Sequence, residues 1–501
     1  MKIAVEGCAH GELEKIYECI EAIQEREGIK IDLLICCGDF QAVRNKTDLC
    51  AMAVPEKYHN MCSFYKYYSG ERRAPILTIF IGGNHEASNY LQELPFGGWV
   101  APNIYYLGRA SVIKIGDLRI GGLSGIFKGH DYLQGLWECP PYTQNSLRSV
   151  YHVRSFDVFR LSQIKEKVHV MLSHDWPRGI TNHGNKEQLI RFKPFFREEI
   201  EANQLGSVPA EKLLHKLEPD YWFSAHLHCQ FVALVKHTNG NETKFLALDK
   251  CLPKRRHLQI LDVPSEFDGD KTLKFDAEWL AILKNTNHLL SVKNVDCHMP
   301  GPGGNERYDF TPTEEEKEAV VTAMKSMIIN DEYFVRTAPT FDPRAPKAAP
   351  SEPVLNPQTS MLCDTLGIDD PVQVIVARKG QSMKGPENYD TVTETSLVKA
   401  TPPKTVIKCS KLSLPAPITP SENDKELSQE VASSNNDSLT ESFINCSEDC
   451  SIPMSATKKT FKRRNISIYN TTDQDDNEST ASTIVDSESS PCKLSFKSSN
   501  L

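Results

Sequence analysis

The stretch ILTIFIGGNHE, residues 76–86, runs from an unbroken apolar segment directly into a small polar cluster. Buried strands of α/β proteins are continuous apolar runs of four to eight residues, whereas half-buried strands alternate. Two glycines end the run, and Asn84, His85 and Glu86 follow with side chains that can bind a metal or move a proton. The stretch therefore predicts a buried strand with chemically active residues at its carboxyl end.

Four further stretches in the first 230 residues have the same construction. In chain order they are KIAV (2–5) before Cys8 and His10, DLLICC (32–37) before Gly38 and Asp39, VHVML (168–172) before Ser173, His174 and Asp175, and YWFS (221–224) before AHLH (225–228). In open α/β sheets the reactive site lies beyond the carboxyl ends of the strands. We therefore expect a thiol, several imidazoles, an Asp and an Asn at one edge of a sheet, a set that can hold two divalent metals.

Helix-like segments separate these strands, and such alternation predicts an α/β fold. Residues 13–27 have apolar side chains at helical spacing and end at Gly28. The other expected elements are helices over 209–217 and 313–327, a hairpin over 111–124 with its turn at 116–117, and two strands between 245 and 263.

The chain is too long, at 501 residues, for one ordinary domain. All five Trp lie before residue 280 and all fifteen His before residue 300, whereas the last 101 residues hold 30 Ser or Thr. Such a composition buries too little apolar surface to offset the entropy of ordering the chain. We expect a catalytic domain over 1–260, an accessory region over 261–338 packed on it, and a Ser/Thr-rich disordered tail over 339–501 that is open to protein partners.

The composition also excludes several broad classes of protein. The formal charge of −9 provides no bulk basic field, so a contact with nucleic acid must use a local patch, such as Arg148, Arg154 and Arg160 or residues 254–256. The fifteen Cys are scattered, which favours reduced thiols inside the cell. No run approaches roughly 18 apolar residues, so no membrane span is expected.

Seven side chains in the strand-end clusters have the chemistry of metal ligands: Cys8, His10, Asp39, Asn84, His174, His226 and His228. If both oxygens of Asp39 are used, the set gives four contacts for each of two metals. Taken singly, Cys8 is a small buried residue, Asp39 a helix N-cap and Asn84 a turn residue. Five strand ends that deliver compatible ligands in order favour the metal site.

The series of motifs resembles the calcineurin-like metallophosphoesterase superfamily. That superfamily usually has Asp two residues before the first His, and Cys at this place, as in Cys8, is typical of the RNA lariat debranching enzymes. The segments similar to that family include CCGDFQAVR (36–44), GGNHEASN (82–89), LSHDWP (172–177), WFSAHLH (222–228) and LALDKCLP (246–253). The resemblance covers residues 1–335 and implies a layered β-sandwich flanked by helices.

The resemblance also implies roles for the candidate residues. One metal would be held by Cys8, His10, Asp39 and His228, and the other by Asp39, Asn84, His174 and His226, with Fe²⁺, Zn²⁺ or Mn²⁺ as the ions. His85 would act as the general acid that protonates or stabilises the leaving oxygen. The reaction would be hydrolysis of the 2′–5′ phosphodiester bond at the branch point of excised intron lariats, which leaves a 5′-phosphate and a free 2′-hydroxyl.

Residues 124–154, called the 124–154 loop below, interrupt the strand–helix pattern with glycines, prolines and aromatics. They match in position the family's lariat recognition loop, and irregular RNA is recognised by stacking on aromatics and by contacts to splayed nucleotides. The other reading is a surface flap that only packs on the domain. The expected substrate-binding residues are Ser124, Gly125, Phe127, His130, Asp131, Tyr132, Trp137, Tyr142, Arg148 and Arg154.

Other functions remain open at this point. A Ser/Thr protein phosphatase shares the GNHE motif, but its usual GDxVDRG is absent, because Gly38-Asp39 is followed by FQAVRN (40–45). A general nuclease or cyclic-nucleotide phosphodiesterase fits the metal chemistry alone, and a catalytically inactive scaffold would need lost ligands, of which none is missing. The basic run KKTFKRR, residues 458–464, predicts a nuclear location, with the cytoplasm as a second compartment.

Overall fold

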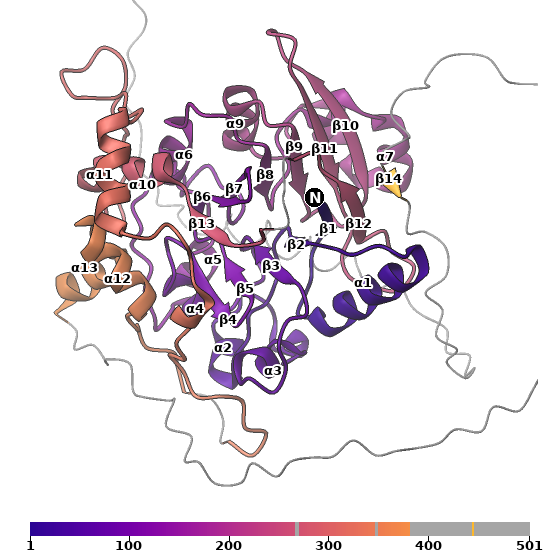
Figure 1. Ribbon diagram of the computed structural model, residues 1–501, viewed down its shortest axis with the longest axis horizontal. Coiled ribbons are helices and arrows are strands. Elements are labelled where there is room, and N and C mark those ends of the chain that lie inside the picture. Colours follow the sequence, from indigo (N-terminus) through magenta and orange to yellow (C-terminus); the bar gives the residue numbers. More distant parts are fainter. Residues whose placement is uncertain (266–269, 346–348, 381–442, 445–501) are drawn as a thin grey trace, which may run out of the picture. The chain divides into compact units, whose positions relative to one another are not determined.

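The computed structural model describes residues 1–265, 270–345 and 349–380, together with the backbone of residues 443–444. Two seven-stranded sheets form the centre of this part (Figure 1). The first sheet has the order β14-β12-β1-β2-β3-β5-β4, and the second has the order β10-β11-β9-β8-β7-β6-β13. Strands β1, β2, β3 and β5 are parallel to one another, as are β7, β8, β9 and β11.

The strands of the first sheet are β1 (Lys2–Glu6), β2 (Leu33–Cys36), β3 (Leu77–Phe80), β4 (Gly98–Ala101), β5 (Ile104–Tyr106), β12 (Leu258–Asp262) and β14 (Phe443–Ile444). Those of the second are β6 (Ala110–Ile115), β7 (Leu118–Leu123), β8 (Val170–Ser173), β9 (Tyr221–Ser224), β10 (Phe231–Lys236), β11 (Glu242–Ala247) and β13 (Leu273–Phe275). The helices are α1 (Leu13–Glu27), α2 (Lys46–Cys50), α3 (Phe64–Tyr68), α4 (Ser88–Gln92), α5 (Gln144–Ser149), α6 (Ser155–Ser162), α7 (Lys186–Phe192), α8 (Arg197–Glu201), α9 (Val208–Leu217), α10 (Ala277–Asn285), α11 (Glu314–Met324), α12 (Pro357–Leu366) and α13 (Pro371–Lys379).

The two sheets pack face to face because their strands are apolar on both sides. In β1, Ile3 and Val5 lie in the core between the sheets together with residues of β8, while Ala4 belongs to the core beneath α1. In the second sheet Met171 and Trp222 belong to a third core that α6, α9 and α10 complete. The layers are therefore helix, sheet, sheet and helix, and the predicted α/β sandwich flanked by helices is confirmed.

The local predictions agree closely with the structure. Helix α1 begins at Leu13 and ends at Gly28, whose left-handed conformation (φ 63°) closes it. The hairpin β6–β7 turns at residues 116–117, and Ile115 pairs with Leu118. Among the described residues, no helix has the length and apolar character that crossing a membrane requires.

The expectation that the ligand clusters meet at one edge of one sheet is wrong. Strands β1, β2 and β3 belong to the first sheet, whereas β8 and β9 belong to the second. Each strand is buried on both faces, so its apolar run carries no information about which sheet it joins. The clusters instead gather where the carboxyl ends of the two packed sheets lie together.

Two predicted boundaries are also wrong. A division after residue 260 falls inside β12, which pairs with β1, and the region that follows adds β13 to the second sheet. The described chain continues past residue 339 into α12 and α13, which lie beside α10 and α11 in Figure 1. Thr337 is buried against the Arg44 guanidinium, which also pairs with Asp48 and Glu93. The folded part therefore reaches residue 380, and the rest of the expected tail lies outside the described residues.

Candidate metal centre

The seven candidate ligands lie where strands of both sheets end. Cys8 and His10 follow β1, Asp39 follows β2, and Asn84 follows β3. From the second sheet, His174 follows β8, and His226 and His228 follow β9. Because parallel strands present their carboxyl ends at the same side, packing the two sheets brings all seven side chains to one place.

Four of these ligands have an unusual backbone. The φ angles are 46° at His10, 45° at Asp39, 63° at His226 and 49° at His228, in the left-handed region that side chains other than glycine disfavour. This conformation turns the chain sharply after each strand. It aims the side chain back over the sheet end, and strained conformations of this kind cluster at functional sites.

The first group of donors consists of Cys8, His10, Asp39 and His228, whose ligand atoms all lie within 4.8 Å of one another. The Nε2 atoms of His10 and His228 are 3.2 Å apart, and Asp39 Oδ2 is 3.7 Å from His10 Nε2. One thiol, two imidazoles and one carboxylate at these separations suit a four-coordinate divalent metal.

The second group is formed by Asp39, Asn84, His174 and His226. His174 Nε2 lies 3.3 Å from Asp39 Oδ1 and 3.2 Å from Asn84 Oδ1, and the rings of His174 and His226 have centroids 5.0 Å apart. The Nδ1 of His174 donates to the Cys37 carbonyl at 2.8 Å, which leaves the Nε2 lone pair free for a metal. Asp39 therefore turns one carboxylate oxygen toward each group, as a bridging ligand must.

The electrostatics of three of the imidazoles fit metal binding. Burial lowers the pKa of His10 to about 4, of His226 to about 3 and of His228 to about 2, so these imidazoles are neutral at pH 7 with lone pairs available. Burial also raises the pKa of the Cys8 thiol, so a metal that binds there must displace its proton. The residues present can hold two divalent ions that share Asp39.

Two glycines and one carboxylate hold the ligand-bearing loops in place. A Cβ at Gly38 would meet His174 Nδ1 at 2.2 Å, and one at Gly83 would meet Asp39 Oδ1 at 2.2 Å, so only glycine fits at either position. The buried Glu86 accepts the N–H groups of Phe40 (2.8 Å), Gln41 (2.8 Å) and Gly83 (2.9 Å). Glu86 thus joins the loops after β2 and β3, a role that sequence reasoning did not assign to it.

His85 lies beside the ligands without belonging to either group. Its backbone N–H donates to Asp39 Oδ1 at 2.9 Å, and its ring centroid is 5.9 Å from that of His10. The ring Nε2 is 3.1 Å from the Asn84 side-chain amide, and the buried Nδ1 has no hydrogen-bond partner among the described residues. An imidazole next to the metal ligands with one nitrogen unengaged fits proton transfer, and the predicted role of His85 stays a prediction.

The 124–154 loop is largely ordered by its own contacts. Arg154, 1% exposed, is paired with Glu138 and donates to backbone carbonyls as well, and Asp131 lies 2.5 Å from His152 Nδ1. The buried Gly125 (φ 90°) passes so close to Tyr151 that any Cβ would clash with its carbonyl. These groups are buried and engaged, so Arg154, Asp131 and Gly125 hold the loop together, and their predicted contacts to RNA stay predictions.

The remaining loop residues are accessible to different degrees. His130 and Arg148 are exposed, whereas the half-buried ones are Ser124, Phe127, Tyr132, Trp137 and Tyr142. Tyr142 donates to Gln92 Oε1 at 2.5 Å, and Ser124 accepts from Gly82 N at 2.9 Å and donates to the Gly108 carbonyl at 2.6 Å. The substrate roles of these seven residues stay predictions, with Ser124 and Tyr142 also tied to the fold.

The 124–154 loop is joined directly to the ligand strand β8. Asp175, the residue after the ligand His174, accepts the backbone N–H of Phe127 at 3.3 Å. Burial raises the pKa of the Asp175 carboxyl to about 6. Sequence reasoning gave Asp175 no task, because nothing in the motif shows that a loop some 50 residues earlier supplies its partner.

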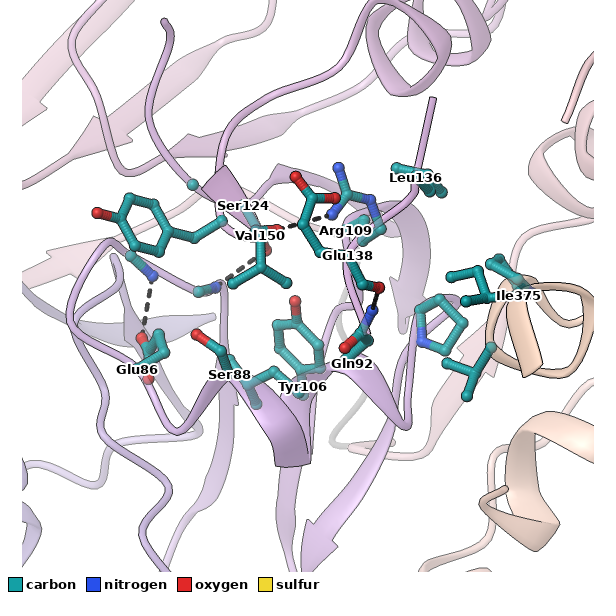
Figure 2. A pocket seen from close by; sticks show the side chains of 18 residues that line it. Glu86, Ser88, Gln92, Tyr106, Arg109, Ser124, Leu136, Glu138, Val150 and Ile375 are labelled. Carbon is teal, nitrogen blue, oxygen red and sulfur yellow. Dashed lines mark hydrogen bonds between the residues drawn. The ribbon is translucent and has the colours of Figure 1, made fainter. Parts of the chain in front are cut away.

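A pocket lies next to the metal ligands (Figure 2). Its walls come from Glu86 and Ser88 after β3, from Glu138 of the 124–154 loop, and from Ile375 of α13, with Tyr106 at its base. Helix α13 was missed by sequence reasoning. The signal was available, because α12 and α13 each begin with an N-cap followed by Pro (356–357 and 370–371) and each end at a left-handed Gly.

Comparison with known proteins places this site in a family. Residues 1–230 match the family model described as calcineurin-like phosphoesterase, and residues 240–371 match the one described as lariat debranching enzyme, C-terminal domain. The lariat debranching enzyme of Drosophila melanogaster is 48% identical, with 94% of this chain and 99% of the relative aligned. The chain belongs to the lariat debranching enzyme family.

Lariat debranching enzymes of two further organisms are also similar to this chain. The family member from Homo sapiens is 52% identical over 74% of this chain and 70% of its own length, and that from Arabidopsis thaliana is 50% identical over 74% of this chain and 86% of its own length. Membership makes the protein a phosphodiesterase-type hydrolase that uses divalent metal ions. The C-terminal match runs to residue 371, which agrees with a folded region longer than the sequence predicted.

Proposed function

We propose that this protein hydrolyses the 2′–5′ phosphodiester bond at the branch point of lariat RNA, leaving a 5′-phosphate and a free 2′-hydroxyl. The observation that carries the proposal is the arrangement of Asp39, with one carboxylate oxygen facing the Cys8–His10–His228 group and the other facing His174. A phosphate placed beside it would lie next to both ligand groups, to His85 and to the 124–154 loop. The relatives to which this chain is similar are lariat debranching enzymes.

When bound, two divalent metals would polarise the phosphate and lower the pKa of a bound water. The chain's own residues perform the other tasks. Glu86 fixes the loops that carry Asp39 and Asn84, and the Cys37 carbonyl fixes the tautomer of His174. His85 is positioned to give a proton to the leaving 2′ oxygen, which would otherwise depart as a poor leaving group.

The two metal positions differ in chemistry, so we propose that they differ in metal preference. Only the first contains a thiol, Cys8, and thiolate favours Zn²⁺ or Fe²⁺ over Mn²⁺. The second, with Asn84, Asp39 and two imidazoles, is open to all three ions. Elemental analysis of protein purified without chelator or added metal tests this, and a Cys8→Ser variant should lose metal from the first position before the second.

Selection of the 2′–5′ bond must come from groups that hold the branch nucleotide, because both linkages present the same phosphate to the metals. We propose that the accessible part of the 124–154 loop does this, with Trp137 and Tyr132 for stacking and His130 and Arg148 for the backbone. Stacking on an aromatic contributes on the order of 1–3 kcal/mol per base.

A short branched RNA that contains both linkage types tests the function. We expect release of the 2′-linked arm with the 3′–5′ bonds intact. Comparable cleavage of a linear RNA would favour a general nuclease, and no hydrolysis with both metals bound would favour a scaffold.

Loop variants test the selectivity. Trp137→Ala and Arg148→Ala should slow branched-RNA cleavage about 10-fold or more while hydrolysis of a small activated phosphodiester stays within a few fold. Arg197→Ala, which removes an exposed Arg of α8 from the surface, is the matched control. Equal losses on both substrates would assign the loop to the fold alone.

We also propose that the protein acts in the nucleus on excised introns and that residues beyond 380 contact protein partners. The basic run at 458–464 and the Ser/Thr-rich composition support this. Both features lie outside the described residues. Replacing the basic residues of 458–464 by Gln should reduce the nuclear fraction of a fluorescent fusion, and an unchanged fraction would remove that part of the proposal.

A further inference from the structure

A second group of metal-binding side chains lies on the opposite face of β1 from the core between the sheets. Glu6 ends β1, His257 immediately precedes β12, and Cys251 lies in the connection between β11 and β12. This group, called the Glu6 cluster below, adjoins the core beneath α1, which contains Ala4, Cys251 and the apolar face of the helix. Glu6 is 0% exposed, and a carboxylate is almost never fully buried in a protein unless it is paired.

The donor atoms of the Glu6 cluster converge. One ligand atom each from Glu6, Cys251 and His257 lie within 4.8 Å of one another. Glu6 Oε2 is 2.8 Å from His257 Nδ1. One thiol, one imidazole and one carboxylate therefore surround one point.

The cluster leaves one polar atom without a partner. Glu6 Oε1 is buried, and among the described residues no group donates to it a hydrogen bond of ordinary geometry. Native proteins seldom leave a buried carboxylate oxygen unsatisfied, and such atoms often mark the place of an ion or water. His257 is 13% exposed at its side chain, so the cluster is open to solvent at one end and an ion can reach it.

We propose that Glu6, Cys251 and His257 bind a Zn²⁺ ion, separate from the two metals of the catalytic centre. One thiolate, one imidazole and one carboxylate are ligands that zinc takes in proteins, and a water molecule at the end open to solvent would complete four-coordination. Binding releases the proton of the thiol and gives the unpartnered oxygen of Glu6 a cation.

The bound ion would join three elements to the catalytic ligand Cys8. Glu6 lies two residues before Cys8, the Cys251 N–H donates to the Cys8 carbonyl at 3.0 Å, and Lys250 forms a β-bridge with Cys8. The ion therefore fixes the segment that carries Cys8 and His10 from behind, which is a positioning role.

Metal counting on the full-length protein tests the proposal. The protein is stripped with a chelator, dialysed against a small excess of Zn²⁺ and analysed for bound zinc. We expect three ions per chain for the unaltered protein and two for Cys251→Ser or His257→Asn. The control is Cys363→Ser, a buried cysteine of α12 outside the Glu6 cluster, which should keep three. Two ions in the unaltered protein, or three in every variant, would overturn the inference.

A spectroscopic test does not depend on how well these variants fold. Co²⁺ bound to thiolate absorbs in the near ultraviolet, and the catalytic centre contributes only Cys8 to such absorption. In Cys8→Ser loaded with Co²⁺ the absorption should therefore persist, and adding Cys251→Ser should weaken it strongly. Complete loss in Cys8→Ser alone would overturn the inference while leaving the proposed hydrolysis untouched, whereas the branched-RNA assay tests that hydrolysis independently.

Discussion

His10, Asp39, His226 and His228 adopt a backbone conformation that costs an L residue roughly 1–2 kcal/mol. Glycine would be the relaxed choice at each of these positions, but glycine carries no ligand atom. The strain persists because the flanking strands and Glu86 fix the chain on both sides. These four residues therefore keep a strained backbone conformation that directs their side chains toward the metal site.

Replacing His85 by Ala should lower the turnover of branched RNA by roughly 10²–10⁴-fold with unchanged metal content. The ring makes one hydrogen bond, to the Asn84 amide, and lies against the His10 ring, while the hydrogen bond to Asp39 comes from the backbone and survives the change. Steady-state kinetics and elemental analysis on the same sample measure both effects. Asn84→Ala is the contrasting variant, since it should lose metal as well as activity; loss of metal in His85→Ala would contradict the assigned role.

The ligands could be predicted from sequence because each one directly follows a recognisable buried strand. The residues that support them could not. Glu86 acts through N–H groups of residues 40 and 41, and Asp175 through that of Phe127, so their partners lie more than 40 residues away in the chain. The structural role of Arg154 was missed for the same reason, because only the fold shows that Arg154 forms an ion pair with Glu138.

Helix α13 begins at a buried carboxyl group. Asp370, 3% exposed, caps the helix by accepting the N–H of Val372 at 2.8 Å, yet burial raises its pKa to about 6. A carboxyl group whose pKa is higher in the folded than in the unfolded state favours folding while protonated. Its contribution is present at low pH and is lost as the pH rises from about 4 to about 6.

The Asp370→Asn variant keeps a side-chain oxygen that can cap α13, but it has no ionisable carboxyl group at this position. The variant should be more stable than the unaltered protein at pH 7.5, by up to about 3 kcal/mol, and this advantage should grow by about 1 kcal/mol between pH 5 and pH 7.5. Urea unfolding of both proteins at the two pH values gives the difference. An advantage that shrinks as the pH rises would show that Asp370 is stabilised as a carboxylate.

Two truncations test whether the C-terminal helices α12 and α13 support activity. Removing residues after 350 should lower the melting temperature and reduce branched-RNA cleavage more than hydrolysis of a small phosphodiester. The reason is that α12 binds Trp99 of β4 through Gln358, while Val372 and Ile375 of α13 pack with Cys139 of the 124–154 loop. The sequence alone predicted that this segment belongs to a disordered tail.

Truncation after residue 380 is the matched control. It removes no candidate ligand and, among the described residues, the two-residue pairing of β14 with β12, so activity should stay within a few fold of the full chain. If both truncations behave alike, α12 and α13 do not support the 124–154 loop.

Most other elements could be predicted with nearly correct ends, α1 and the β6–β7 hairpin among them, because their signals are local: apolar spacing and a terminal Gly. Helices α12 and α13 carry equally good caps, but they stand among the prolines of 339–357 and next to the Ser/Thr-rich segment. Composition averaged over a long window concealed two short helices. Their stability comes from packing on distant parts of the fold, and composition does not report such contacts.

The metal site lies where the two sheets pack together, so metal ions bound there would contact ligands from both sheets. Ions that bind only the folded state stabilise it, by roughly 2.7 kcal/mol at a metal concentration 100 times the dissociation constant. Chelation should therefore lower the midpoint of thermal unfolding by several degrees.

Asp39→Asn provides the comparison for this measurement. The shift on chelation should be smaller in that variant, since the carboxylate shared by both ligand groups is gone. Differential scanning calorimetry with and without chelator measures it. An equal shift in the two proteins would contradict the assignment of Asp39 as the shared ligand.

The pairing of β1 with β12 has a consequence for how the protein is made. Lys2 pairs with Asp262, so the strand that leads to Cys8 and His10 emerges first from the ribosome and waits for a neighbour synthesised about 250 residues later. Until then β1 has an open edge, which invites aggregation. Chains interrupted before β12 lack this closure, even though all seven ligands have already been translated. The pairing that completes the support of Cys8 and His10 therefore cannot form until about half of the chain has been synthesised.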